Sequence, residues 1–127
     1  MREHAADPPV EETVGQALRE TDGTVAVAEG CTGGLVAALL TGVPGSSDYF
    51  DRGLVPYSYD SLRETLAVSR ETLDHHGVVS APATREIAQG VRDTAKTTWG
   101  VATMGVATPQ VVFAVSDLES HVADRRG

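Results

Sequence analysis

The stretch that decides the fold runs from Thr24 to Leu40 and reads TVAVAEGCTGGLVAALL. Residues 24–28 form a short apolar run bounded by turns, which predicts a strand buried on both faces, as parallel strands usually are. The glycines of EGCTGG predict a tight turn, and residues 35–43 have the length and composition of a helix that stops at Pro44. A strand, a turn and a helix in this order are typical of α/β proteins.

The segments on either side continue this alternation of helices and strands. A helix is predicted over 8–21, with Asp7 as its cap and Pro8 in its first position. A strand is predicted over 53–59, at an edge of the sheet or with a bulge, because Pro56 has no N–H to give to a neighbouring strand. Further helices are predicted over 60–66, over 70–75 between Ser69 and Gly77, and over 81–97 behind Ser80, and further strands over 99–103 and 110–115.

These elements predict a single-domain α/β/α structure with a mixed sheet. The chain has 127 residues, close to the length of one domain. The last two strands are joined by too few residues for a helical crossover, so they are expected to pair antiparallel while the others are parallel. The domain is expected to cover residues 9–116, with tails at 1–8 and 117–127.

Composition argues against several classes of function. The chain has 18 acidic and 10 basic residues and a net charge of −8, so no nucleic-acid partner is expected. Lys96 is its one lysine, and such an acidic surface is typical of proteins from salt-rich cells, where salt screens repulsion between like charges. Cys31 is its one cysteine, and no apolar run approaches the ~20 residues of a membrane span. A cytoplasmic protein with no membrane partner is therefore predicted.

The turn at 30–34 is the strongest candidate site. Backbone N–H groups at the start of a helix attract phosphates, carboxylates and developing oxyanions. The spacing differs from both a Walker A loop and GxGxxG, so the residues alone leave two interpretations open, an anion-binding turn or a plain tight turn. The adjacent His75 and His76 diverge on a helix and no other cluster has metal-ligand spacing, so no metal or cofactor is predicted.

Several segments of the sequence resemble one known family. VAVAEGCTGGLVAALLTGVPGSSDYFDRGLVPYS, ETLDHHGVVS and TMGVATP are similar to the core of the CinA C-terminal domain family, and the similarity covers about residues 9–109. The resemblance implies a compact α/β/α sandwich. It also implies a relationship to nicotinamide-nucleotide amidohydrolases, which convert nicotinamide mononucleotide to nicotinate mononucleotide and ammonia.

The sequence departs from this family at the residues that would carry out the reaction. The resemblance places the nucleophilic serine of the family at Gly30 and its basic lysine at Leu62, five residues after Tyr57. Amide hydrolysis needs an activated oxygen or sulfur nucleophile, so the sequence predicts a nucleotide-binding or regulatory module without hydrolytic activity. Two alternatives stay open: an active deamidase with relocated groups, and a structural or oligomerisation module. The weaker candidates for relocated groups are Cys31, Thr32, Tyr57 and Thr103.

The resemblance retains the part that would bind a ligand. A small phosphate-bearing nucleotide is the expected partner, and a homo-oligomer is a further expectation. Glu29 is expected to accept hydrogen bonds from backbone amides of the turn. The expected ligand-binding residues are Gly30, Cys31, Thr32, Gly33 and Gly34.

Two further groups of residues bear on the pocket. Thr103 is expected to be either a pocket hydroxyl or a strand-end threonine bonded to the backbone. Met104 and Thr108 are larger than the resemblance implies for an open loop, and the glycine-rich run and last helix of the family have no counterpart in the sequence. Four aromatic residues could stack on a nicotinamide ring, although half-buried packing in the core is the commoner fate of such side chains: Tyr49, Phe50, Tyr57 and Tyr59.

Overall fold

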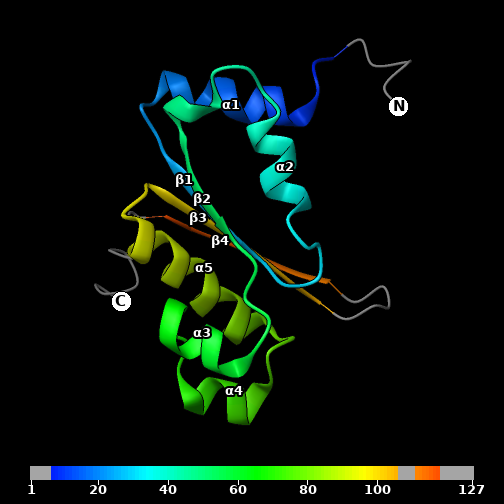
Figure 1. The fold of residues 1–127 in the computed structure, drawn as a ribbon, viewed down its shortest axis with the longest axis vertical. Coiled ribbons are helices and arrows are strands. Elements are labelled where there is room, and N and C mark those ends of the chain that lie inside the picture. The colour runs from blue at the N-terminus through cyan, green and yellow to red at the C-terminus, as the bar shows by residue number, and fades with distance from the viewer. Residues whose placement is uncertain (1–6, 106–110, 118–127) are drawn as a thin grey trace.

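The computed structural model describes residues 7–105 and 111–117 as one layered α/β unit (Figure 1). The other residues, which include both predicted tails apart from Asp7, Pro8 and Asp117, lie outside the described part. Its elements in chain order are α1 (Val10–Glu20), β1 (Val25–Glu29), α2 (Leu35–Thr41), a 3-10 helix (Ser46–Asp48), β2 (Phe50–Leu54), α3 (Tyr59–Leu66), α4 (Arg70–His76), α5 (Ala81–Ala95), β3 (Trp99–Gly105) and β4 (Val111–Asp117).

The sheet has the order β2-β1-β3-β4 and is mixed, as predicted. β1 pairs parallel with β2 and β3, and β3 pairs antiparallel with β4. Every residue of β1 is buried, which confirms that its unbroken apolar run marks a strand covered on both faces. None of the helices in the described ranges reaches the length and hydrophobicity that a bilayer crossing requires.

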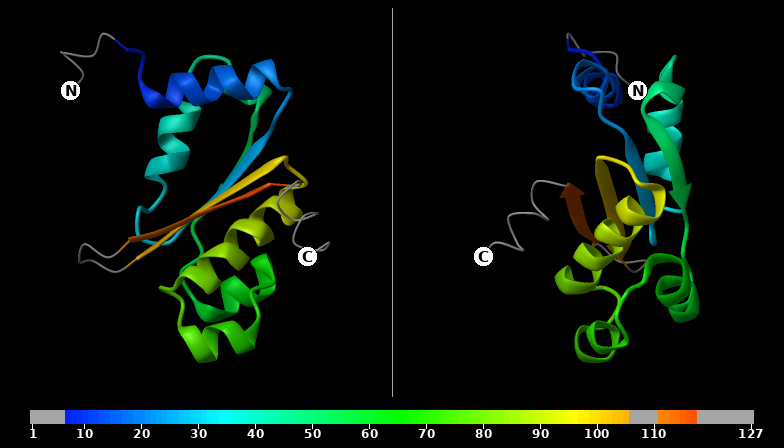
Figure 2. Two further views of the ribbon diagram at one scale, coloured as in Figure 1. Left: turned by 180° about the vertical axis from the view of Figure 1, so that it is seen from behind. Right: turned by 90° about the vertical axis from the view of Figure 1, so that its left-hand side faces the viewer.

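Helices cover both faces of the sheet (Figure 2). α3, α4 and α5 lie on one face, where α5 contacts β1, β3 and β4, and α1 and α2 lie on the other. Alternating side chains of the strands divide between two apolar cores. The core under α3–α5 includes Ala26, Ala28, Leu62, Ile87 and Met104, and the core under α1 and α2 includes Leu18, Val25, Val27, Leu40 and Tyr49.

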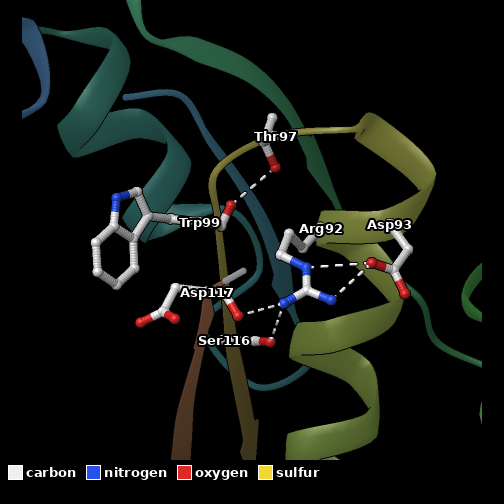
Figure 3. A network of polar contacts seen from close by, with 6 residues as sticks. All are labelled: Arg92, Asp93, Thr97, Trp99, Ser116 and Asp117. Atoms are coloured by element: carbon white, nitrogen blue, oxygen red, sulfur yellow. Dashed lines mark hydrogen bonds and ion pairs between the residues drawn. The ribbon is translucent and has the colours of Figure 1, made fainter. Parts of the chain in front are cut away.

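A buried charge ties the end of α5 to the end of β4 (Figure 3). Arg92 is 1% exposed, and its guanidinium donates to the hydroxyl of Ser116 at 3.0 Å and to the main-chain oxygen of Asp117. The same guanidinium forms an ion pair with Asp93 at 2.8 Å. A buried arginine is tolerated when its donors are paired in this way. This network fixes the sheet at the end opposite the glycine-rich turn.

Three predicted helix boundaries are confirmed by their capping bonds. The hydroxyl of Ser69 accepts from the N–H of Thr72 at the start of α4, and that of Ser80 accepts from the N–H of Ala83 at the start of α5. Gly77 ends α4 with a φ of +75°, a conformation that glycine adopts without strain.

Two predicted elements need correction. α1 begins at Val10, and Asp7 does not cap it; the carbonyl of Pro9 accepts from the N–H groups of Glu12 and Thr13 instead. The second strand is Phe50–Leu54 rather than 53–59. It is an edge strand, as expected, but it ends before Pro56. The strand begins closer to the N-terminus than predicted, because Phe50 packs against the core under α1 and α2.

The remaining boundary differences are smaller. α5 ends at Ala95 rather than at residue 97, because Lys96 takes the left-handed conformation that ends a helix. β3 continues past Thr103 to Gly105, since Met104 is buried in the core rather than exposed in a loop. Thr108 and Pro109, which belong to the matched stretch TMGVATP, and Gln110, the predicted start of the last strand, lie outside the described residues.

Candidate functional site

One pocket lies at the carboxyl ends of β1 and β3, the edge where open α/β sheets commonly bind ligands. Its volume is about 470 Å³, within the range of small-molecule sites. It brings together Gly30 and Leu62, the two positions that the resemblance singled out. The pocket is lined by Gly30, Cys31, Pro56, Tyr57, Tyr59, Leu62, Val78, Met104 and Gly105.

The side chain of Met104 fills the space beside Gly30. A Cβ atom at residue 30 would lie 2.5 Å from the Sδ and 2.7 Å from the Cε of Met104. Ordinary van der Waals contacts of such an atom are at 3.4–4 Å. The N–H of Gly30 donates to the carbonyl of Thr103 at 2.7 Å, which holds the turn against β3. A side chain at residue 30 would therefore require Met104 to move.

Leu62, the other family position in the pocket, is also apolar. Leu62 lies on the buried side of α3, is 2% exposed and packs in the core with Leu66 and Ile87. A leucine side chain can neither accept nor donate a proton. At the two family positions the pocket thus offers a glycine and a buried leucine.

A polar chain lies at the α2 side of the same turn. The hydroxyl of Thr32 donates to Oε1 of Glu29 at 2.6 Å. The hydroxyl oxygens of Thr32 and Thr103 lie 2.9 Å apart. Because the single proton of Thr32 goes to Glu29, Thr103 is the donor in the second contact. The chain therefore runs from Thr103 through Thr32 to the carboxylate, which is 1% exposed.

Glu29 also caps α2. Its Oε1 accepts from the N–H of Val36 at 2.8 Å and its Oε2 from the N–H of Ala37 at 2.9 Å. Gly33 and Gly34, with φ angles of +61° and +108°, bring the chain from Glu29 back to the start of the helix. The bonding of Glu29 to backbone amides is confirmed, but those amides belong to the helix rather than to the turn.

The cap formed by Glu29 makes the predicted anion site at residues 30–34 less favourable. Two N–H groups of the first helical turn already bond to a buried carboxylate, whose charge compensates the helix dipole. An anion at the turn would meet that carboxylate nearby. Sequence analysis did not predict that Glu29 bonds to Thr32 and to the first turn of α2. The spacing of Glu29 and Thr32, three residues apart, is nevertheless a usable signal for a local hydrogen bond.

The structure separates the four aromatic candidates into two groups. Tyr57, which is 92% exposed, and Tyr59 line the pocket. Tyr49 and Phe50 follow the alternative of core packing, because Tyr49 is buried in the core under α1 and α2 and Phe50 packs against that core.

The remaining candidates are placed as follows. Cys31 is exposed and lines the pocket. The hydroxyl of Thr103 bonds to the side chain of Thr32, on the α2 side of the sheet, and no backbone partner for it is found within residues 7–105 and 111–117. His75 and His76 lie in the last turn of α4, with ring centroids 6.5 Å apart. Sequence reasoning missed the pocket roles of Pro56 and Val78, for which the sequence carries no clear signal.

Comparison with known proteins identifies relatives of the chain. The sequence model of the CinA C-terminal domain matches residues 7–113. A CinA-like protein of Desulfosudis oleivorans is 51% identical over 100 residues, which are 79% of this chain and 24% of that protein. The nicotinamide-nucleotide amidohydrolase PncC of Escherichia coli K12 is 44% identical over 98 residues, 77% of this chain and 59% of the enzyme.

The similarity extends to solved structures. A competence/damage-inducible protein from Agrobacterium tumefaciens superimposes with a TM-score of 0.82 at 30% identity, over 91% of this chain and 78% of that chain. A competence- or damage-inducible protein from Enterobacter asburiae gives 0.81 at 27% identity, over 85% of this chain and 74% of that chain. The chain spans about a quarter of the CinA-like relative and 59% of the amidohydrolase.

Proposed function

The chain belongs to the CinA C-terminal domain family, and from that premise we propose that it is a nucleotide-binding or regulatory member that does not hydrolyse nicotinamide mononucleotide. The observation that carries the proposal is the filling of the space beside Gly30 by Met104. A nucleophile at this point of the pocket would need a side chain, and that space holds a thioether.

The rest of the pocket supports the same conclusion. Nucleophilic hydrolysis of an amide needs a nucleophile and a base within hydrogen-bond reach of each other. Leu62, at the family position of the base, supplies no basic group. When the members of such a catalytic unit are lost together, most of the rate enhancement is lost with them. The pocket retains shape and aromatic walls, which suit binding.

The proposed ligand is a small phosphate-bearing nucleotide. Tyr57 and Tyr59 line the pocket and could stack on a planar ring, and the turn at 31–34, of which Cys31 lines the pocket, is the proposed source of backbone N–H groups for a phosphate. The Glu29 carboxylate and the net charge of −8 oppose an anion, so the binding should be weak. A titration followed by amide chemical shifts tests this, with nicotinamide mononucleotide and inorganic phosphate as probes. Unmoved shifts at residues 30–34 with both probes would contradict ligand binding here.

An ammonia-release assay tests the absence of hydrolysis. The purified chain is incubated with nicotinamide mononucleotide in low and in high salt, beside the Escherichia coli amidohydrolase as a positive control. We expect ammonia only from the control enzyme. Ammonia release by the chain that disappears in Cys31→Ala or Thr32→Ala would overturn the proposal.

A second candidate function rests on one distance. The hydroxyl of Thr32 lies 2.6 Å from a carboxylate oxygen of Glu29, the geometry of a nucleophile beside a base. Against it, both oxygens of Glu29 hold N–H groups of α2, so a proton taken by Glu29 would disturb the helix cap. If the chain is an active deamidase through this pair, Thr32→Ser should retain ammonia release and Thr32→Val should abolish it.

The contact between residues 30 and 104 is testable without substrate. Gly30→Ser should destabilise the protein by about 1 kcal/mol, the low end of the cost of overpacking, because only the flexible end of Met104 has to move. The same change in a Met104→Ala background should cost less, because the smaller side chain leaves room. Urea unfolding of the two single variants and the double variant measures the coupling. Additive effects would show that Met104 does not oppose a side chain at residue 30.

A further inference from the structure

The pocket at the carboxyl ends of β1 and β3 differs between its inner end and its mouth. Leu62 and Met104 line the pocket and are buried, so they form its inner end. Tyr57 and Tyr59 line it and are exposed, so they form its mouth. A planar ring that enters between the tyrosines therefore meets an aliphatic side chain and a thioether with its leading edge, which we call the inner edge of the ring.

Met104 reaches the place where a side chain of residue 30 would begin. Its Sδ and Cε lie 2.5 and 2.7 Å from the position of a Cβ atom at residue 30. The N–H of Gly30 donates to the carbonyl of Thr103 at 2.7 Å, so this donor is already bonded to β3. A polar group of a ligand that reaches residue 30 thus meets the thioether, and it finds neither a side chain nor a free N–H of that residue.

The polar chain formed by Glu29, Thr32 and Thr103 does not compensate for this. Successive side chains of a strand point to opposite faces of the sheet. Thr103 accordingly points toward Thr32 on the α2 side, and Met104 points into the core under α3–α5. None of the three polar residues lines the pocket. Their hydroxyls and the carboxylate are therefore not available to a ring at the inner end.

A polar substituent on the inner edge of the ring would lose hydrogen bonds on entry. A carboxamide bonds to water through its oxygen and through its N–H groups. The thioether of Met104 and the side chain of Leu62 do not replace these bonds, and a buried polar group without a partner weakens binding. An inner edge with only C–H or methyl groups loses no such bonds, and it gains a sulfur–aromatic contact with Met104.

We propose that Met104 determines which ring the pocket accepts, and that it favours a ring without a polar substituent on its inner edge. The inference rests on the proposed function, because it takes this pocket as the place where the ring of the ligand binds. It narrows the class of ligand to a phosphate-bearing nucleotide whose ring has a hydrocarbon inner edge, in preference to one that carries a carboxamide there.

Two small ring compounds that differ in one substituent test the preference. Nicotinamide and 3-methylpyridine share a pyridine ring, which carries a carboxamide in the first and a methyl group in the second. The chain has two methionines, Met1 and Met104, so methyl-labelled methionine provides a signal from the pocket itself. Both compounds are titrated at millimolar concentrations in mildly alkaline buffer, in which both rings are uncharged. We expect 3-methylpyridine to move the Met104 signal and to bind about tenfold more tightly than nicotinamide, since a buried polar group without a partner costs about that much affinity.

Substitution of Met104 should reduce the preference. Met104→Ala opens the space beside residue 30 to water and to the carboxamide, so the ratio of the two dissociation constants should fall to about twofold. Met104→Val, a strand-forming residue that is shorter than methionine, should act in the same direction with less disturbance of the core. Val78→Ala is the matched control, because Val78 lines the same pocket and packs against the same core, and it should leave the ratio unchanged. The amide signals of Cys31 and Tyr57 report binding in all variants.

The outcomes separate this inference from the proposed function. Clear binding of both compounds with nicotinamide equal to or tighter than 3-methylpyridine would overturn the inference alone. A Met104 signal that 3-methylpyridine leaves unmoved while the amide signals respond, or a ratio that Val78→Ala lowers as much as the Met104 variants do, would also overturn it. If neither compound moves the amide signals of Cys31 and Tyr57, the pocket binds no ring, and the proposed function fails together with the inference.

Discussion

The two faces of the sheet are held by different means. On the α3–α5 face the helix α5 is in backbone contact with its neighbours: a Cβ atom at Gly100 would lie 2.1 Å from the carbonyl oxygen of Ala88, and one at Gly90 would lie 2.1 Å from that of Leu66. On the other face α2 is seven residues long and buries one of them, Leu40.

This contrast bears on how the site can differ from that of the family's amidohydrolases while the fold is retained. The α3–α5 face has close backbone packing, whereas α2, which also packs on β2 through Ala37, is in addition held at its start by the carboxylate of Glu29. The pocket lies at the end of the sheet where both arrangements meet. If the proposed loss of hydrolysis is correct, Gly30 and Leu62 alter the chemistry of the pocket while the surrounding scaffold is retained.

The largest effect is expected on the closely packed face. Gly100→Ala sets a methyl group against the backbone of α5, which cannot move as a flexible side chain can, and should destabilise the protein by about 3 kcal/mol or more. Gly42→Ala on α2 is the control, because Gly42 has a φ of −70° that alanine readily adopts. Urea unfolding compares the two. A loss at Gly42 equal to that at Gly100 would break the distinction between the faces.

The next effect concerns the polar attachment of α2. Glu29→Ala removes the acceptor of Val36, Ala37 and Thr32, and the loss should be about 2–3 kcal/mol, as for other buried hydrogen-bonding groups left without a partner. Glu29→Gln keeps one oxygen acceptor and should cost less. Hydrogen exchange at Val36 and Ala37 should accelerate in both variants. If exchange at these two amides is unchanged in Glu29→Ala, the carboxylate does not hold α2.

A smaller effect is expected from the other end of the polar chain. Thr103→Val keeps the shape of the side chain and removes its donor to Thr32, which should cost about 1 kcal/mol. Thr103→Ser should restore most of that loss, since it returns the hydroxyl. Thermal unfolding measures both variants. If Thr103→Val is as stable as the unsubstituted protein, the bond from Thr103 to Thr32 does not contribute to stability.

The sequence predicted the frame of the fold because local signals and the buried pattern agreed there. The apolar run at 24–28, the capping serines and the short connection before the last strand all predicted what the structure contains. The second strand was misplaced because Pro56 and the apolar residues around it suggested a strand, whereas the position of β2 is decided by packing of Phe50 across the sheet.

Only the part of the candidate site that matches a family pattern could be predicted from the sequence. Gly30 and Leu62 could be compared with a family pattern, and they do line one pocket. The contact of Met104 with Gly30 and the bond between Thr32 and Thr103 join residues more than seventy positions apart, and no local pattern in the sequence encodes such pairs.

The smallest expected effects come from one substitution made on both faces of a single strand. Val112 points to the α5 side, where its partner Met104 is buried, and Val115 points to the open side, where it is 63% exposed. Val→Thr keeps the shape and the strand preference of the side chain and adds a hydroxyl. At Val112 the hydroxyl is partly withdrawn from water, so the loss should be about 1 kcal/mol, the lower end of the cost of burying a polar group. At Val115 water still reaches it, so the change should stay within about 0.5 kcal/mol, as for most surface substitutions. Urea unfolding measures both variants. If Val115→Thr destabilises the protein more than Val112→Thr does, the exposed face of β4 contributes at least as much to stability as the face covered by α5.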